Sequence, residues 1–261
     1  MRWEPIISFC VGEGLCLKGF EVLKFKESEE EDLETYFLKA SSSVDFANFL
    51  RQCDEVKNLH FSGDFYRYVF SVLGKLPQKF DLFFNLNLDT LRTYAKEIKE
   101  AVEDLEKKTE GKVRVFLEVT ERSYVVNGDV VNVLVKDRVE VLKKVKEVLG
   151  RRIIVDDFGR GIANFDLINA PCEAGIAGVK IDVKVIPFNV CKEVVKYLSR
   201  AVKVKSFLVV FEKIEDEKTL ARFVKDFLVK ESKNGFGFLK FCYQGFVFKK
   251  FFKELFLSYK N

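Results

Sequence analysis

The chain has 261 residues, of which 48% are hydrophobic and 32% are charged. This composition excludes an intrinsically disordered chain, and the length fits a single α/β domain that spans residues 1–261. The net charge of +4, from 44 basic and 40 acidic side chains, is nearly balanced. It argues against a protein that tracks a polymeric nucleic acid, while a local phosphate site stays open.

The cysteines and the apolar runs indicate in which cellular compartment the protein works and which metal sites are not expected. The six cysteines form no Cys-x-x-Cys pair and the chain has one histidine, His60, so no zinc site of cysteine and histidine is expected. We expect reduced, packed thiols in a cytoplasmic protein. No apolar run approaches the ~20 residues of a membrane span, and the first residues do not form a signal peptide, so no membrane association is expected.

Short apolar runs alternate with longer amphipathic segments along almost the whole chain. The runs that predict strands are, in order, 4–11, 19–25, 80–87, 113–119, 151–157, 178–182, 206–214 and, more weakly, 238–248. The segments that predict helices are 29–39, 44–56, 64–75, 88–108, 133–149, 190–203 and 216–231.

This alternation predicts a mostly parallel sheet with crossover helices, the α/β class. About eight strands in a chain of this length fit a closed (β/α)8 TIM-like barrel better than an open sheet. An open doubly wound sheet remains the structural alternative.

Polar side chains lie where the predicted strands end. The segment "GVKID" places Lys180 and Asp182 two residues apart on one strand face, and Glu21 lies inside "GFEVL". Because parallel barrel strands end at one rim, we expect these groups to converge there. The other strand-end groups are Asn85, Glu118, Asp156, Asp157 and Glu212.

A cluster of this kind indicates a metal site. Several carboxylates cannot share a dry pocket while all are ionised, and a divalent cation removes the conflict. Oxygen ligands without histidine or thiolate suit Mg²⁺, Mn²⁺ or Ca²⁺ and not Zn²⁺ or Cu²⁺. The adjacent Asp156 and Asp157 can reach two ions, as in two-metal phosphoester cleavage. Any one of these acids alone is more often a helix cap or a loop hydrogen-bonding group, so only their convergence favours metal binding.

The strand ends also form a series of short motifs. They are Glu21-Val22-Leu23, "FFNLN" with Asn85, "LEVTE" from Glu118 to Glu121, "DDFG" from Asp156, "KID" from Lys180, "EKIED" from Glu212, and Gln244-Gly245. This series resembles, in order, the motifs of the EAL-domain family, the bacterial cyclic-di-GMP phosphodiesterases. The match spans residues 4 to 248, and its strength comes from the order and not from any single motif.

The resemblance implies a barrel with one antiparallel strand that hydrolyses cyclic-di-GMP (c-di-GMP) to linear pGpG, often as a homodimer. It implies two ions, Mg²⁺ or Mn²⁺. The first ion would be held by Glu21, Asn85, Glu118 and Asp156. The second would be held by Asp156, Asp157 and Glu212.

The resemblance also implies roles for the remaining residues. Lys180 would orient or activate the attacking water, and Glu21 and Glu212 are the other expected catalytic residues. The expected substrate-binding residues are Asp182, Gln244 and Arg160. Glu121 and Glu215 are expected to stabilise the loop after "DDFG".

Two segments differ from the family pattern. Phe25 stands where the family carries a phosphate-binding arginine, and we hypothesise that Arg160 supplies the missing positive charge. Residues 160–164 read Arg-Gly-Ile-Ala-Asn where the family reads Thr-Gly-Tyr-Ser-Ser, so Ala163 offers no hydroxyl to Glu121. Two alternatives to hydrolysis of c-di-GMP therefore stay open. One is a non-catalytic c-di-GMP receptor or protein-interaction module, and the other is a barrel that cleaves a different phosphodiester.

Overall fold

The computed structural model describes residues 2–10, 14–23, 80–86, 88–119, 124–126, 129–131, 135–158, 175–233 and 238–248. Its strands are β1 (Arg2–Cys10), β2 (Gly14–Leu23), β3 (Phe80–Leu86), β4 (Val113–Val119), β5 (Tyr124–Val126), β6 (Asp129–Val131), β7 (Ile153–Val155), β8 (Ile176–Asp182), β9 (Phe207–Glu212) and β10 (Leu239–Gln244). Its helices are α4 (Leu88–Lys108), α5 (Val135–Leu149), α7 (Phe188–Ala201), α8 (Glu217–Lys233) and the short 3-10 helix η2 (Phe246–Phe248).

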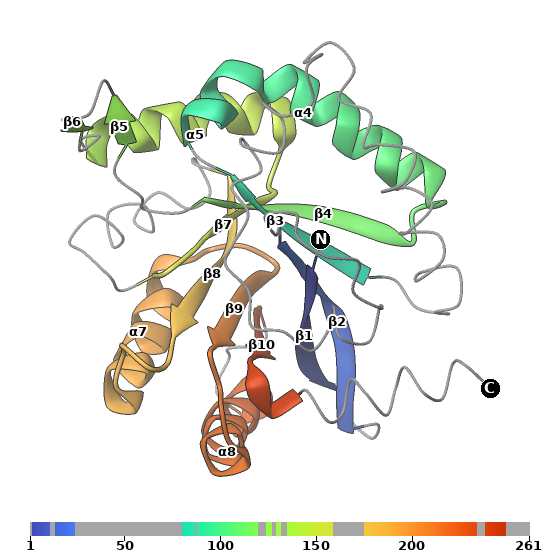
Figure 1. Cartoon of the computed structure of the whole chain (residues 1–261). Helices are drawn as coiled ribbons and strands as arrows, with labels where there is room; N and C mark the ends of the chain where they lie inside the picture. The colour runs from blue at the N-terminus through green and yellow to red at the C-terminus, as the bar shows by residue number, and fades with distance from the viewer. Residues whose placement is uncertain are drawn as a thin grey trace.

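Eight strands close into a barrel in the order β1-β10-β9-β8-β7-β4-β3-β2 (Figure 1). Six consecutive pairs, from β2–β3 to β9–β10, are parallel. Strand β1 is antiparallel to both of its neighbours, β2 and β10. The predicted closed barrel with one antiparallel strand is therefore confirmed, and the open doubly wound sheet is wrong because the ring closes.

The four α-helices that the structure describes match the predicted segments closely. Helix α4 has the predicted bounds, and α5, α7 and α8 differ from their predictions by about two residues. Helices α4 and α5 lie side by side against one part of the ring, while α7 and α8 lie on another (Figure 1). The three helices predicted within residues 29–75 lie outside the described residues.

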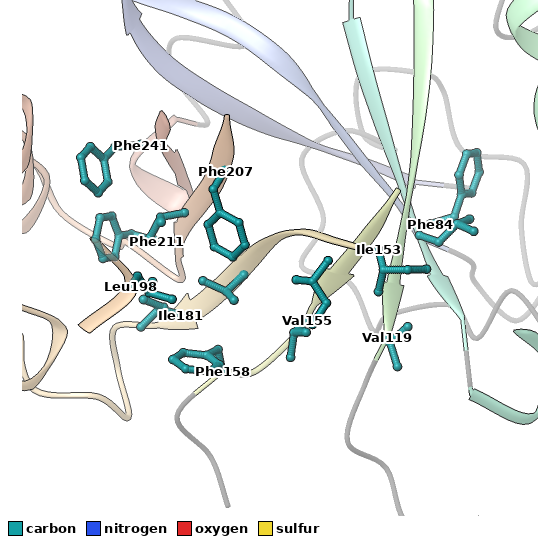
Figure 2. Close-up of a cluster of buried hydrophobic side chains, with 14 of the residues drawn as sticks. Phe84, Val119, Ile153, Val155, Phe158, Ile181, Leu198, Phe207, Phe211 and Phe241 are labelled. Carbon is teal, nitrogen blue, oxygen red and sulfur yellow. The ribbon is translucent and has the colours of Figure 1, made fainter. Parts of the chain in front are cut away.

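Most of the core lies between the ring and the helices, and Figure 2 shows part of it. Along β3, β4, β7, β9 and β10, alternate residues point outward into this layer, as Phe207 and Phe211 of β9 do. Phe211 stacks on Phe227 of α8, with ring centroids 4.7 Å apart. Burial of one such ring stabilises the fold by about 1.5–3 kcal/mol, which explains the use of phenylalanine as core filler.

A smaller apolar cluster fills the inside of the barrel. Its members are Ile6, Phe83, Phe116, Ile154, Ala177, Leu208, Val210 and Cys242. Because side chains alternate along a strand, the residue two positions further on faces the same interior. On β4, β9 and β10 that residue is polar, namely Glu118, Glu212 and Gln244. The cluster therefore forms an apolar floor beneath a polar rim.

A two-stranded hairpin of β5 and β6 was not among the predicted elements. Its pairing places Val126 opposite Asp129, with Asn127 and Gly128 between them in the sequence. Asn-Gly between two valine-rich segments is a strong hairpin signal, so the sequence does carry this element.

The remaining expectations concern thiols and membranes. Cys191 and Cys242 are buried, as predicted for packed thiols. Within the described part of the chain, none of the helices has both the length and the apolar character needed to cross a bilayer.

Candidate metal centre

A single lysine ammonium lies among four carboxylates at the rim of the barrel. The Nζ atom of Lys180 is 2.8 Å from Oε2 of Glu21 and 3.1 Å from Oε2 of Glu118. It is 3.3 Å from Oε2 of Glu212 and 3.8 Å from Oδ1 of Asp156. The Lys180 side chain is 1% exposed, and none of the four carboxylates is more than 12% exposed. Residues up to 191 positions apart in the chain thus share one dry cluster.

The barrel strands bring these groups together. Glu21, Glu118 and Glu212 project from β2, β4 and β9, and Lys180 projects from β8. Asp156 is the first residue after β7. All five strands are members of the parallel set, so these positions meet at the carboxyl-terminal rim, as the sequence predicts.

The turn after β7 positions the two adjacent aspartates. Strand β7 ends at Val155, so it is shorter than the predicted run that included both aspartates. The N–H of Asp156 donates to the carbonyl of Val119 on β4, and the N–H of Phe158 donates to the carbonyl of Lys180 on β8. Asp157 has a left-handed φ of 49° between these two bonds. The turn is therefore tied to both neighbouring strands and holds its carboxylates at the rim.

The Gln244-Gly245 motif has a structural reason. The Nε2 of Gln244 donates to Oε2 of Glu21 at 2.7 Å, the same oxygen that accepts from Lys180. Gly245 has a φ of 145°, and a Cβ there would lie 2.3 Å from the carbonyl oxygen of Ile214. Glycine therefore allows the end of β10 to pack closely on the segment after β9, which fixes Gln244 beside Glu21.

A second lysine, Lys213, lies beside an outer group of carboxylates. The Nζ of Lys213 lies 2.7 Å from Oδ2 of Asp182, 3.7 Å from Oε1 of Glu212 and 3.9 Å from Oδ1 of Asp157. Oδ1 of Asp182 accepts the N–H of Lys184. Lys213 is not among the predicted site residues, and its only signal in the sequence is its place directly after the strand-end Glu212.

Burial and crowding shift the pKa values of the inner cluster. Burial raises the pKa of Glu118 well above its usual value, and the neighbouring Glu21 carboxylate raises it further. Burial also raises the pKa of Asp156, and it raises that of Glu212 to about 7, in both cases against the attraction of Lys180. Burial alone would lower the pKa of Lys180, but the surrounding carboxylates raise it well above its usual value. One ammonium therefore does not compensate for four buried carboxylates.

The donor set suits a hard divalent cation. One oxygen each from Asp156, Asp157 and Glu212 can be chosen so that all three lie within 4.8 Å of one another. The Oε1 of Glu118 is buried and accepts no hydrogen bond from any residue that the structure describes. Carboxylate oxygens with excess negative charge and a buried oxygen of this kind fit a hard divalent cation such as Mg²⁺, Mn²⁺ or Ca²⁺.

Several predicted site residues are not placed in the centre. The backbone of Asn85 lies in β3, opposite the β4 residue Glu118, but its side chain lies outside the described residues. Arg160 and Glu121 also lie outside the described residues. Glu215 is half-exposed and forms an ion pair with Lys184. The roles of these four residues stay predictions.

The fold matches solved structures, although the sequence alone does not find relatives. No protein-family model matches the sequence, and no curated protein does. The structure of YkuI from Bacillus subtilis, a protein with an EAL domain in complex with the substrate c-di-GMP and calcium, matches with a TM-score of 0.53 and 19% identity. BlrP1 from Klebsiella pneumoniae, in a complex with manganese and c-di-GMP at pH 9.0, matches with a TM-score of 0.50 and 18% identity.

These matches extend over nearly the whole chain but over only part of each relative. The YkuI match covers 98% of this chain and 60% of YkuI, and the BlrP1 match covers 94% of this chain and 55% of BlrP1. The chain thus shares its barrel fold with an EAL-domain protein, in agreement with the family that its motifs resemble.

Proposed function

We propose that the chain is a metal-dependent phosphodiesterase that hydrolyses c-di-GMP to linear pGpG. The observation that carries the proposal is the buried cluster of four carboxylates around Lys180, at the rim where barrel enzymes place their active sites. The complexes of YkuI and BlrP1 with c-di-GMP and a divalent metal support this substrate.

The residues of the rim would hold two ions, Mg²⁺ or Mn²⁺. Glu21, Asn85, Glu118 and Asp156 are proposed for the first ion. The second ion would be held by Asp156, Asp157 and Glu212, the set whose oxygens lie close together. When bound, such ions supply a nucleophilic hydroxide at neutral pH and stabilise the charge that develops on the phosphate.

The chain's own polar groups then orient the reactants. In the metal-free cluster Lys180 carries its proton, because the surrounding carboxylates raise its pKa against the opposing effect of burial. Its ammonium is proposed to donate to the attacking water, and Glu21, held by Gln244, keeps that ammonium in place. The apolar floor beneath the rim keeps bulk water away from one side of the site. Asp182, Gln244 and Arg160 remain the proposed substrate-binding residues.

Turnover tests this proposal directly. The protein is incubated with c-di-GMP and Mn²⁺ or Mg²⁺, and pGpG is followed by chromatography. Glu21→Gln keeps the size of the side chain but removes its charge, and it should lower turnover at least about 100-fold. Glu193→Gln, on the exposed face of α7, is the matched control and should be unaffected. Ca²⁺ should inhibit, because its larger and looser shell disturbs the geometry for in-line attack.

The alternative is a c-di-GMP receptor or interaction module without turnover. Phe25 favours it, because an arginine that binds phosphate is missing at that position of the motif. Binding of c-di-GMP measured by calorimetry, together with the lack of pGpG after long incubation with Mn²⁺, would establish the receptor and refute the enzyme.

A further inference from the structure

Lys213 adopts a backbone conformation that lysine rarely uses. Its φ is 62°, in the left-handed region where a side chain crowds the backbone and glycine is favoured. The flanking backbone is fixed on both sides, because the carbonyl of Glu212 accepts the N–H of Val183 and the N–H of Ile214 donates to the carbonyl of Gln244. A lysine is thus held in a strained conformation at the edge of the candidate metal centre, a pattern that points to a function at the site.

The side chain of Lys213 turns toward the centre. Its ammonium lies 3.7 Å from Glu212 and 3.9 Å from Asp157, which are two of the three residues that can hold the outer ion. It also donates to Asp182, whose side chain is 2% exposed, while Lys213 itself is 43% exposed. A lysine whose side chain is 43% exposed carries its positive charge at neutral pH.

A neighbouring lysine shows that this position is specific. Lys184 lies on the same rim, and its side chain is 48% exposed, close to the 43% of Lys213. Its Nζ pairs with the half-exposed Glu215 and makes no ion pair with the three outer-ion residues among the contacts of the described residues. Only Lys213 of these two brings a positive charge to carboxylates that an ion would use.

We propose that Lys213 is a tethered cation that competes with the outer divalent ion, which Asp156, Asp157 and Glu212 would hold. An ammonium on the same carboxylates repels a divalent ion and already neutralises part of the charge that would attract it. Lys213 therefore lowers the affinity of the outer ion and sets the metal concentration at which the centre fills. The inference rests on the metal centre of the proposed function and deepens it.

The test measures metal binding and not turnover. The full chain is freed of metal with a chelator and titrated with Mn²⁺, with bound ions counted by calorimetry and by electron paramagnetic resonance. We expect the outer ion to be the more weakly bound of the two. The Lys213→Gln variant should bind this Mn²⁺ at least about tenfold more tightly than the unaltered protein does. Lys213→Gly, which suits the left-handed backbone, should give the same gain and guards against misfolding of the glutamine variant.

Two controls keep the charge argument separate from other effects. Lys213→Arg keeps the positive charge and should leave the weaker affinity unchanged. Lys184→Gln removes one charge from the same rim without touching these carboxylates, and it too should leave the affinity unchanged.

An unchanged or weakened Mn²⁺ affinity in both Lys213→Gln and Lys213→Gly overturns the inference. If the unaltered protein also binds Mn²⁺ and forms pGpG, that result leaves the proposed function standing. If no variant binds Mn²⁺, both the inference and the two-ion centre fall together.

Discussion

The two ends of the barrel differ in the ratio of cations to carboxylates. At the amino-terminal end, the single carboxylate of Asp81 accepts two hydrogen bonds of 2.9 Å from Arg114 and lies 3.0 Å from Nζ of Lys18. At the carboxyl-terminal rim, four carboxylates surround the one ammonium of Lys180. Around Asp81, the first end thus has two cations for one anion, and we call this group the amino-terminal ion cluster. The second has an excess of negative charge, which is the property that a metal centre requires.

The largest expected effect follows from removal of Lys180, the cation that all four inner carboxylates share. Lys180→Met leaves four buried carboxylates without their common partner and should destabilise the metal-free protein by about 3–5 kcal/mol. Urea denaturation in the presence of a chelator measures this loss. Mn²⁺ should restore much of the stability, while turnover stays lost. A loss below about 1 kcal/mol in chelator would show that the ammonium is not what holds the rim together.

The carboxylates of the rim should make the stability of the protein depend on pH. The pKa of Glu212 is raised from 4.5 to about 7, so the folded protein keeps a proton that the unfolded chain releases. Glu212 therefore contributes most to the stability of the metal-free protein below about pH 4.5. As pH rises from there toward 7, this contribution is lost, and the free energy of unfolding falls by on the order of 3 kcal/mol. Glu118 and Asp156, whose pKa values are also raised, contribute in the same direction.

Thermal melts between pH 5 and 8 in chelator measure this slope. Glu212→Gln should flatten it, and Mn²⁺ should reverse it, because the ion binds the deprotonated carboxylates more tightly as pH rises. A slope that Glu212→Gln leaves unchanged would assign the titration to other groups.

A smaller effect is expected at the amino-terminal end. Arg114→Met removes a half-exposed guanidinium while Lys18 stays beside Asp81, so the loss of stability should be about 1 kcal/mol. Mn²⁺ affinity and turnover should not change, because Arg114 pairs with Asp81 at the end of the barrel opposite the rim. A loss of Mn²⁺ binding in this variant would show that the two ends are coupled through the interior cluster.

The last effect, of a similar size, separates backbone strain from charge at Lys213. Lys213→Gly and Lys213→Gln both remove the charge, but only glycine relieves the left-handed φ of 62°. The glycine variant should be more stable than the glutamine variant by about 1 kcal/mol, measured by urea denaturation. Equal stabilities would mean that the surrounding backbone bonds bear no strain.

The sequence predicts the barrel and much of the rim, because both depend on periodic patterns. Apolar runs that alternate with amphipathic helices predict the ring, and acids at strand ends predict the convergence around Lys180. The details of turns do not follow from such patterns. Strand β7 ends at Val155 and is shorter than predicted, because the turn begins at Asp156. The next residue, Asp157, takes a left-handed conformation.

Lys213 shows most clearly what a sequence pattern cannot supply. Its place after Glu212 is visible in the sequence, but the direction of its side chain depends on a φ of 62° that is unusual for lysine. The backbone on either side is held by a bond of Glu212 to Val183, directly after β8, and by a bond of Ile214 to Gln244 of β10, both far away in the chain. The hairpin of β5 and β6 is a different case, because the sequence carries its Asn-Gly turn signal.

The antiparallel strand β1 gives the barrel a seam that runs beside the site. β1 separates β2 from β10, and the side chains of Glu21 and Gln244 meet across it at 2.7 Å. Its residues Glu4 and Ile6 are paired in register with Glu21 and Gln244, respectively. If β1 detached, the same event would open the ring and release the hydrogen bond that orients Glu21. Hydrogen exchange of the β1 amides would then measure how often the ring opens. The same equilibrium would determine the fraction of molecules in which Gln244 orients Glu21.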